Sequence, residues 1–287
     1  MSGKTSSAAK RSSSSKTAET RTSYTHSSSI WVAPLVFLCP FFVMVFSYTI
    51  LKLDGSLALL LQESRQKGAG GILYSAWMPY IFGSAKAWKI LLPYIVFQLS
   101  LMKILPGKLT KGPVTPAGNV PLYKGNGMLS YLVSLITFFL CAYLFKVFNP
   151  AEIYDHYMEF IGAMNVFSLF ICLGLYVKGR VYPSSTDHGV SGKFLFDYYG
   201  GPELYPRILN GDVKLFTLCR FGMMGWPLLI LSYAAQQYEA HGLSDSMVVA
   251  VALQLIYVTK FFHWEMGYMK TLDIMHDRAG FYLVSVY

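Results

Sequence analysis

The stretch IGAMNVFSLFICLGLYV, residues 161–177, contains no charged side chain over its whole length. A helix that crosses the ~30 Å hydrocarbon core of a bilayer needs roughly 20 predominantly apolar residues. A run of this kind is therefore typical of a transmembrane helix. Three other runs share the property, at residues 30–51, 128–145 and 221–238. Together they predict a chain that crosses a membrane several times.

Two more runs, 87–105 and 246–264, contain only one or two lysines, at or near their ends. Lysine side chains at such positions can reach the polar interface while their stems remain in apolar surroundings. A further run begins near Ile274, and the sequence reaches Tyr287 before that run could cross a bilayer. We therefore predict an all-α fold, a polytopic transmembrane helical bundle with six complete spans and the start of a seventh.

The chain is 54% hydrophobic and 14% charged, with a net charge of +9. Nucleic-acid binding is one reading of this charge, but its distribution follows the membrane pattern in which cytosolic connections are rich in Lys and Arg. The N-terminal tail and the connections 106–126 and 178–220 are basic, whereas the connections around Glu152 and Asp245 are acidic. The connection 52–86 is the exception to this pattern, because it is basic although it would lie on the same side of the membrane as the acidic connections. These charges predict a lipid bilayer as partner, no nucleic acid, and a cytosolic N-terminus.

Residues 1–29 are rich in Ser, Thr and Lys and have no hydrophobic period, so we expect a disordered cytosolic tail. Residues 30–287 are expected to form the membrane domain. Its long polar connections are 52–86, 106–126 and 178–220. The second of them is punctuated by proline and glycine, which excludes a helix running through it.

The third long connection contains GKFLFDYYGGPELYPRIL, residues 192–209. Its prolines predict an extended or turning backbone. The planar guanidinium of Arg207 suits a carboxylate or a phosphate, and Asp197 and Glu203 are local carboxylate partners. Two readings stay open, an internal brace at the membrane face and a site for a ligand.

The end of the chain contains WEMGYMKTLDIMHDRAGFY, residues 264–282. On a helix, Asp273 and Asp277 would lie on one face, where like charges repel and call for a nearby cation. Ionisable groups beside a membrane segment are candidate functional residues. His263 and His276 do not have metal-ligand spacing and the four cysteines contain no CxxC motif, so we predict no metal site.

Residues 192–207 resemble the signature of the membrane-bound sterol reductases. The matching positions are Gly192, Leu195, Asp197, Tyr199, Gly201, Leu204, Pro206 and Arg207, whereas Phe196 and Tyr205 depart from the pattern. The loop GPVTPAGNVPLYKGNG, residues 112–127, is more similar to the 7-dehydrocholesterol reductase branch of the family than to the delta-14 branch. The stretches 177–194, 254–262 and 264–282 follow in the same order.

The resemblance implies an enzyme of the endoplasmic reticulum membrane that uses NADPH to reduce the C7=C8 double bond of a 5,7-diene sterol. A proton would add to one alkene carbon and a hydride to the other. By resemblance, Tyr257 in QLIYVTKFF is the candidate acid, and Glu265, Asp273 and Asp277 are candidate pocket or orienting residues. The family's cofactor-contacting segments lie in a C-terminal part that this sequence does not contain. We therefore assign no cofactor-binding residue and expect the sequence to be incomplete.

Three alternatives remain beside this reading. One is a delta-14 sterol reductase, and another is a catalytically silent protein of the same fold that binds sterols or acts as a scaffold. A transporter is disfavoured because the sequence shows no internal repeat and no charge in the middle of its spans. The partners expected from the resemblance are the sterol and the bilayer, with room for a homo-oligomer or a hetero-oligomer with other sterol-pathway membrane enzymes.

Overall fold

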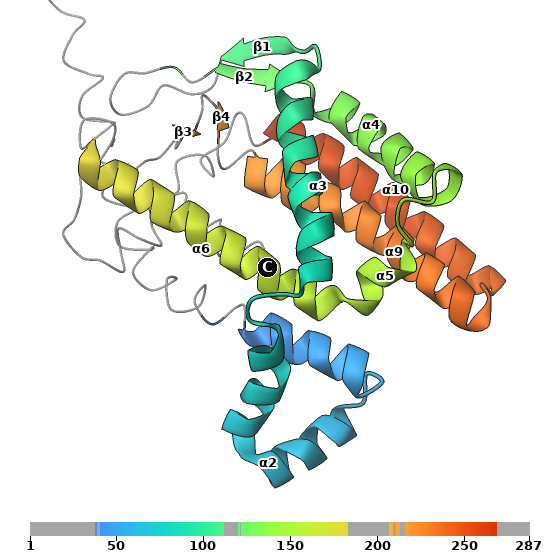
Figure 1. Ribbon diagram of the computed structural model, residues 1–287. Helices are drawn as coiled ribbons and strands as arrows, with labels where there is room; N and C mark the ends of the chain where they lie inside the picture. Colours follow the sequence, from blue (N-terminus) through green and yellow to red (C-terminus); the bar gives the residue numbers. More distant parts are fainter. Residues whose placement is uncertain are drawn as a thin grey trace, which may run out of the picture.

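The computed structural model describes residues 38, 41–111, 120, 122–182, 207–208, 211–212 and 216–268. For residues 207–208, 211–212, 216–219 and 264–268 it describes the backbone alone. Helices make up most of these residues, with α3 standing at the centre and α9 and α10 lying side by side (Figure 1).

The helical elements follow in chain order. An N-terminal helix, Phe41–Lys52, precedes α2. The others are α2 (Leu57–Trp77), the 3₁₀ turn η1 (Met78–Tyr80), α3 (Ala85–Ile104), α4 (Gly127–Phe139) with its π-helical continuation η2 (Leu140–Leu144), α5 (Ala151–Asp155), α6 (Tyr157–Val181), the π-helical η4 (Phe216–Met223), α9 (Met224–His241) and α10 (Asp245–Tyr268).

Four helices are long and apolar enough to cross a membrane. They are Ala85–Ile104, Gly127–Leu144, Tyr157–Val181 and Asp245–His263. Each coincides with a predicted span, which confirms those four segments as apolar helices of sufficient length. The predicted polytopic helical character is therefore found in the described part of the chain.

The predicted count of six spans is not confirmed. Helix Phe41–Lys52 and the segment Leu57–Tyr80 qualify only as a pair, bent by 113°, which makes either a broken span or a re-entrant loop. The run 221–238 is helical in η4 and α9 but is not among the helices that are apolar enough to span. The predicted start of a seventh span lies outside the described residues.

The connection 52–86, predicted as long and polar, is largely helical. Ser56 caps the start of α2 by accepting a hydrogen bond from the Leu59 amide at 3.3 Å. Lys67 pairs with Glu63 one turn earlier, with 3.3 Å between Nζ and Oε2, and such i,i+4 pairs stabilise helices. The charges that indicated a loop therefore lie on a helix, which bends at Gly68, where φ is +72°.

The described residues of the loop between α3 and α4 are non-helical, as predicted, and form two paired strands. Strand β1 (Lys108–Lys111) pairs antiparallel with β2 (Leu122–Gly125). A second, very short pair joins β3 (Arg207–Ile208) to β4 (Gly211–Asp212). These two small sheets depart from the purely all-α prediction.

The core lies where α6 crosses the earlier helices. One buried cluster joins α3, α6 and η4 through Leu91, Ile95, Phe160 and Phe221. A second cluster joins helix Phe41–Lys52 and α2 to the start of α6. The contact between η1 and α6 is close enough that a Cβ atom at Gly162 would overlap the carbonyl oxygen of Tyr80. Glycine is therefore required at that point of α6.

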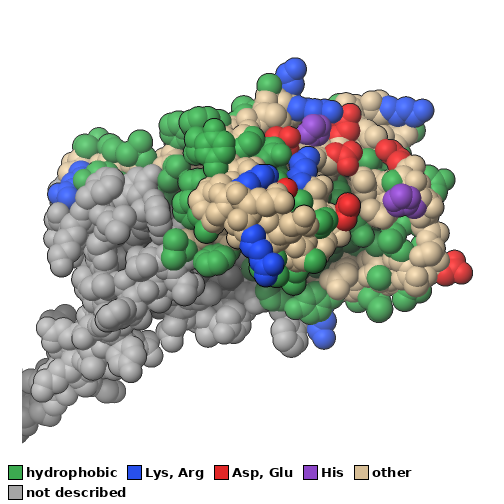
Figure 2. All heavy atoms as spheres, turned by 90° about the horizontal axis from the view of Figure 1, so that it is seen from below, with side chains coloured by type: hydrophobic (Ala, Val, Ile, Leu, Met, Phe, Trp, Pro, Cys, Tyr) green, Lys and Arg blue, Asp and Glu red, His purple; other side chains and the backbone are tan. Residues whose placement is uncertain are grey.

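Two acidic connections meet at one end of the bundle. The Asn149 side chain, just before α5, donates a hydrogen bond to Glu239, near the end of α9, at 3.0 Å. Lys86 Nζ, at the start of α3, lies 3.1 Å from Glu152 Oε1. The face seen from below carries acidic, basic and histidine side chains together (Figure 2). The β1–β2 hairpin lies at the opposite end of α3 (Figure 1).

Candidate functional site

A cavity of about 1500 Å³ opens between the helices. It is bounded by helix Phe41–Lys52, α3, α4, α5, α6, η4, α9 and α10. Its lining is largely aliphatic and aromatic. Small-molecule sites usually measure ~300–1,000 Å³ and have mostly apolar walls with a few placed polar groups. This cavity is therefore large enough for a bulky apolar ligand.

Tyr94 connects the wall of the cavity to the π-helical segment η4. Its hydroxyl donates to the carbonyl oxygen of Phe221 at 3.0 Å, and its ring lies 5.5 Å from the Phe221 ring. A π-helical turn shifts backbone carbonyls from their α-helical positions, and such turns recur at functional sites. Here the hydroxyl of a partly buried tyrosine satisfies one of these carbonyls.

A buried polar cluster around Arg220 lies beside the cavity. The Arg220 side chain is 1% exposed, and its Nη1 donates to Ser130 Oγ at 2.7 Å. Its Nη2 donates to Asn126 Oδ1, and Asn126 Nδ2 in turn donates to the Leu105 carbonyl at 2.9 Å. The arginine thus joins η4 to the start of α4 and the end of α3. Sequence reasoning missed this role, because Arg220 counted only as a cytosolic cation.

A row of side-chain hydrogen bonds runs from this cluster to the cavity wall. Ser134 Oγ donates to the Ser130 carbonyl at 2.7 Å and accepts from Gln98 Nε2 at 2.8 Å. Gln98 and Ser134 both line the cavity. Because the Ser134 hydroxyl donates its proton to the Ser130 carbonyl, it can only accept a hydrogen bond from Gln98. The amide nitrogen of Gln98, and not its oxygen, therefore faces Ser134.

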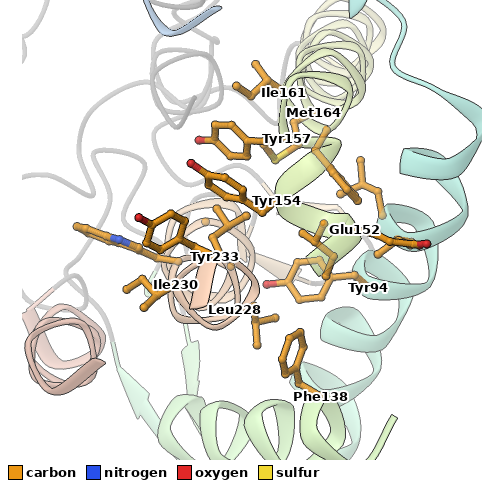
Figure 3. Close-up of a pocket in the computed structure, with 18 of the residues that line it drawn as sticks. Tyr94, Phe138, Glu152, Tyr154, Tyr157, Ile161, Met164, Leu228, Ile230 and Tyr233 are labelled. Carbon is orange, nitrogen blue, oxygen red and sulfur yellow. The ribbon is translucent and has the colours of Figure 1, made fainter. Parts of the chain in front are cut away.

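Three tyrosines gather at the end of the cavity next to α5. Tyr154 comes from α5, Tyr157 from the start of α6 and Tyr233 from α9, and all three line the cavity. The Tyr154 and Tyr233 rings lie 5.0 Å apart. In Figure 3 the hydroxyl groups of the three rings turn to the same side. Burial, with smaller contributions from Tyr233, Tyr157 and Asp155, raises the pKa of Tyr154, so its hydroxyl stays neutral at physiological pH.

Tyr257, the predicted acid, lies on α10 with its side chain 56% exposed. Its ring stacks on Phe261 at 6.2 Å and meets Trp226 edge-on at 6.5 Å. Both of these neighbours line the cavity, whereas Tyr257 is not among the lining residues. The structure therefore places Tyr257 behind the aromatic wall of the cavity, and its role stays a prediction.

For the other predicted site residues, the structure describes either the backbone alone or nothing. Arg207 belongs to β3, where it pairs with Asp212 through the backbone, and Glu265 lies in α10. The remaining candidates, Asp197, Glu203, Asp273 and Asp277, lie outside the described residues. The brace between Arg207 and a carboxylate therefore stays a prediction.

The described cavity lining does not fit a phosphate-bearing cofactor. Its cations are Lys86 and Lys89, and Lys86 is paired with Glu152. Dinucleotide phosphates are usually held by arginine forks, lysines and the N-termini of helices. This composition suits a neutral apolar ligand better than NADPH.

Comparison with known proteins decides the family. The sequence model of the Ergosterol biosynthesis ERG4/ERG24 family matches residues 29–286. The chain belongs to this family. The match covers the whole region predicted to be the membrane domain, so the ERG4/ERG24 assignment confirms the resemblance to sterol reductases.

Several curated ERG4/ERG24 relatives align with this chain. A 7-dehydrocholesterol reductase of Arabidopsis thaliana is 46% identical over 251 residues, 87% of this chain and 57% of the relative. The 7-dehydrocholesterol reductase of Xenopus laevis is 32% identical over 88% of this chain and 56% of the relative. A delta(14)-sterol reductase of Arabidopsis thaliana is 33% identical over 68% of this chain and 53% of the relative. The chain spans about half the length of these relatives.

Proposed function

We propose that this chain is the sterol-binding membrane part of an NADPH-dependent reductase that saturates the C7=C8 double bond of a 5,7-diene sterol. The observation that carries this proposal is a comparison within one plant. The chain is 46% identical to the Arabidopsis 7-dehydrocholesterol reductase but 33% identical to the Arabidopsis delta(14)-sterol reductase. The endoplasmic reticulum membrane is the location that fits such a substrate.

The cavity supports this proposal because its walls suit a rigid hydrocarbon. Rings of Tyr94, Phe138 and Trp226 line it, and aromatic faces stabilise cations that pass close to them. Reduction of the alkene adds one proton and one hydride, and protonation leaves a cationic carbon. An apolar cavity with aromatic walls excludes water from such a carbon.

We assign the proton donor to Tyr257 within this proposal. Its ring lies against the rings of Trp226 and Phe261, and both of these residues line the cavity. Glu265 follows two turns later on α10. In the same proposal Glu265, Asp273 and Asp277 orient the donor or the sterol, and Arg207 braces the preceding loop with Asp197 or Glu203.

The first test is expression of the chain in cells that accumulate a 5,7-diene sterol. We expect the chain to bind that sterol in preference to an 8,14-diene sterol. Joined to the part of the Arabidopsis 7-dehydrocholesterol reductase that its match does not cover, it should remove the C7=C8 bond from cellular sterols, as measured by mass spectrometry. Preference for the 8,14-diene would support the delta-14 alternative. Sterol binding without conversion would support the silent sterol-binding protein.

The second test concerns Tyr257. In the chain completed with the C-terminal part of such a relative, Tyr257→Phe should keep sterol binding and lower turnover by roughly 10²–10⁴-fold, the usual effect of losing a general acid. Tyr143→Phe is the matched control, because Tyr143 is an exposed tyrosine of η2 outside the cavity lining. Full turnover in Tyr257→Phe would remove Tyr257 from the mechanism.

A further inference from the structure

The tyrosines of the described bundle differ in what their hydroxyls bind. Tyr94 donates to the Phe221 carbonyl, and Tyr131 shares a hydrogen bond of 2.6 Å with Thr259. The cluster formed by Tyr154, Tyr157 and Tyr233 makes no hydrogen bond through its hydroxyls to any described residue. Tyrosine hydroxyls in protein interiors usually have a partner. The three hydroxyls therefore remain available to whatever occupies the cavity.

The position of this cluster gives the cavity one polar end. The Lys86–Glu152 pair flanks it, and Glu152 and Tyr154 belong to the same short helix α5. Along α3, the cavity extends from Lys86 to Gln98, roughly 18 Å at 1.5 Å per residue. Ile90, Leu91, Pro93 and Phe97 line the stretch between them. The cavity is thus an elongated apolar volume with hydroxyl groups at its α5 end.

We propose that Tyr154, Tyr157 and Tyr233 bind the single hydroxyl group of the ligand and hold the sterol with its 3-hydroxyl at the α5 end of the cavity. A phenol hydroxyl both donates and accepts hydrogen bonds, and so does a sterol hydroxyl. Adjacent phenols can therefore donate one hydrogen bond to the sterol hydroxyl and accept another from it. The rest of the sterol then lies against the apolar walls toward Gln98. The choice of a sterol as the ligand rests on the proposed function.

Gln98 is another polar group in the wall that has a free hydrogen-bonding atom. Its Oε1 is buried without a hydrogen-bond partner among the described residues. The whole Gln98 side chain is 0% exposed, however, so a ligand would have to displace its neighbours to reach that oxygen. The three tyrosines are only partly buried. A ligand can therefore reach their hydroxyls without such a rearrangement.

The test compares two ligands on the full chain in detergent. One is a 5,7-diene sterol and the other is the same sterol without its 3-hydroxyl. We expect the wild-type chain to bind the hydroxylated sterol about tenfold more tightly, since each hydrogen bond contributes roughly three- to tenfold. Tyr154→Phe, Tyr157→Phe and Tyr233→Phe should each reduce this ratio, and the triple variant should bring it close to one. Affinity for the sterol without the hydroxyl should stay unchanged.

Two control variants separate this site from other tyrosine effects. Tyr143→Phe and Tyr74→Phe each change an exposed tyrosine outside the cavity lining. Both should keep the wild-type ratio. The assignment would be overturned by a wild-type ratio near one. It would also be overturned if the single and triple variants of the cluster kept the wild-type ratio. Either result would leave sterol binding itself established. Failure of the wild-type chain to bind either sterol would overturn the proposed function and this site together.

Discussion

At the scale of single residues, the guanidinium of Arg220 holds together three segments that are far apart in the sequence. It donates to Ser130 and Asn126, and Asn126 donates to the end of α3. Arg220→Ala would leave Asn126 Oδ1 and Ser130 Oγ without this donor in a buried site. Each buried polar group that loses its partner costs about 1–3 kcal/mol. We therefore expect the free energy of unfolding to fall by several kcal/mol, measured by thermal or denaturant unfolding in detergent.

The matched control for Arg220→Ala is Arg65→Ala, which removes an exposed arginine on α2. It should change stability by less than about 0.5 kcal/mol. Arg220→Lys keeps the charge but lacks the planar fork that reaches two acceptors at once, so it should be intermediate. Equal stability of the two alanine variants would show that the Arg220 cluster does not hold the segments together.

Sequence reasoning could propose residues of recognisable motifs but not residues defined by their burial. Asn126 was part of the loop that carried the family resemblance, and the structure places it at the centre of the Arg220 cluster. Arg220 itself lies 94 positions away, and nothing in its neighbourhood indicates a buried partner. The Tyr154, Tyr157 and Tyr233 cluster was missed for the same reason, because its members come from three elements.

At the scale of elements, the close contact between η1 and α6 gives a prediction with a control on the same helix. A Cβ atom at Gly162 would overlap the Tyr80 carbonyl oxygen, which belongs to backbone and cannot move aside easily. Gly162→Ala should therefore lower the free energy of unfolding by roughly 1–3 kcal/mol, the usual cost of overpacking. Thermal unfolding of the purified variant measures this effect.

The control is Gly174→Ala, farther along α6, where an added Cβ meets no atom within 4 Å. Alanine is a better helix former than glycine by up to ~1 kcal/mol. This variant should therefore be as stable as the wild type or slightly more stable. A loss of stability at Gly174 equal to that at Gly162 would contradict the close-contact explanation.

The helices that sequence reasoning found were those in which apolar length alone decides the outcome. The runs 87–105, 128–145, 161–177 and 246–264 are helices because a long apolar segment has to satisfy its own backbone in lipid. The helix from Leu57 to Trp77 was not predicted from the sequence, because the charged residues in its middle interrupt the apolar residues at its two ends. The hairpin β1–β2 could be predicted only as an absence of helix, since its register depends on pairing across the loop.

At the scale of the whole molecule, the charged connections sort into two ends. The hydrogen bond from Asn149 to Glu239 brings the acidic regions around Glu152 and Asp245 to one end. The basic hairpin β1–β2 lies at the other end of α3 (Figure 1). This arrangement agrees with the alternation of acidic and basic connections in the sequence. Excess Lys and Arg marks cytosolic connections, so the hairpin end should face the cytosol.

This orientation predicts which connections a glycosylation tag will report as lumenal. Tags on flexible linkers, inserted next to Gly242 and in the connection before α5, should both be glycosylated in microsomes. Tags between β1 and β2, or before residue 30, should remain unmodified. The mobility shift removed by a glycosidase provides the measurement, and acceptor asparagines replaced by glutamine in each tag provide the control.

The reverse pattern would place the N-terminus in the lumen. Different outcomes at Gly242 and before α5 would contradict the fold itself, because Asn149 and Glu239 lie in direct contact.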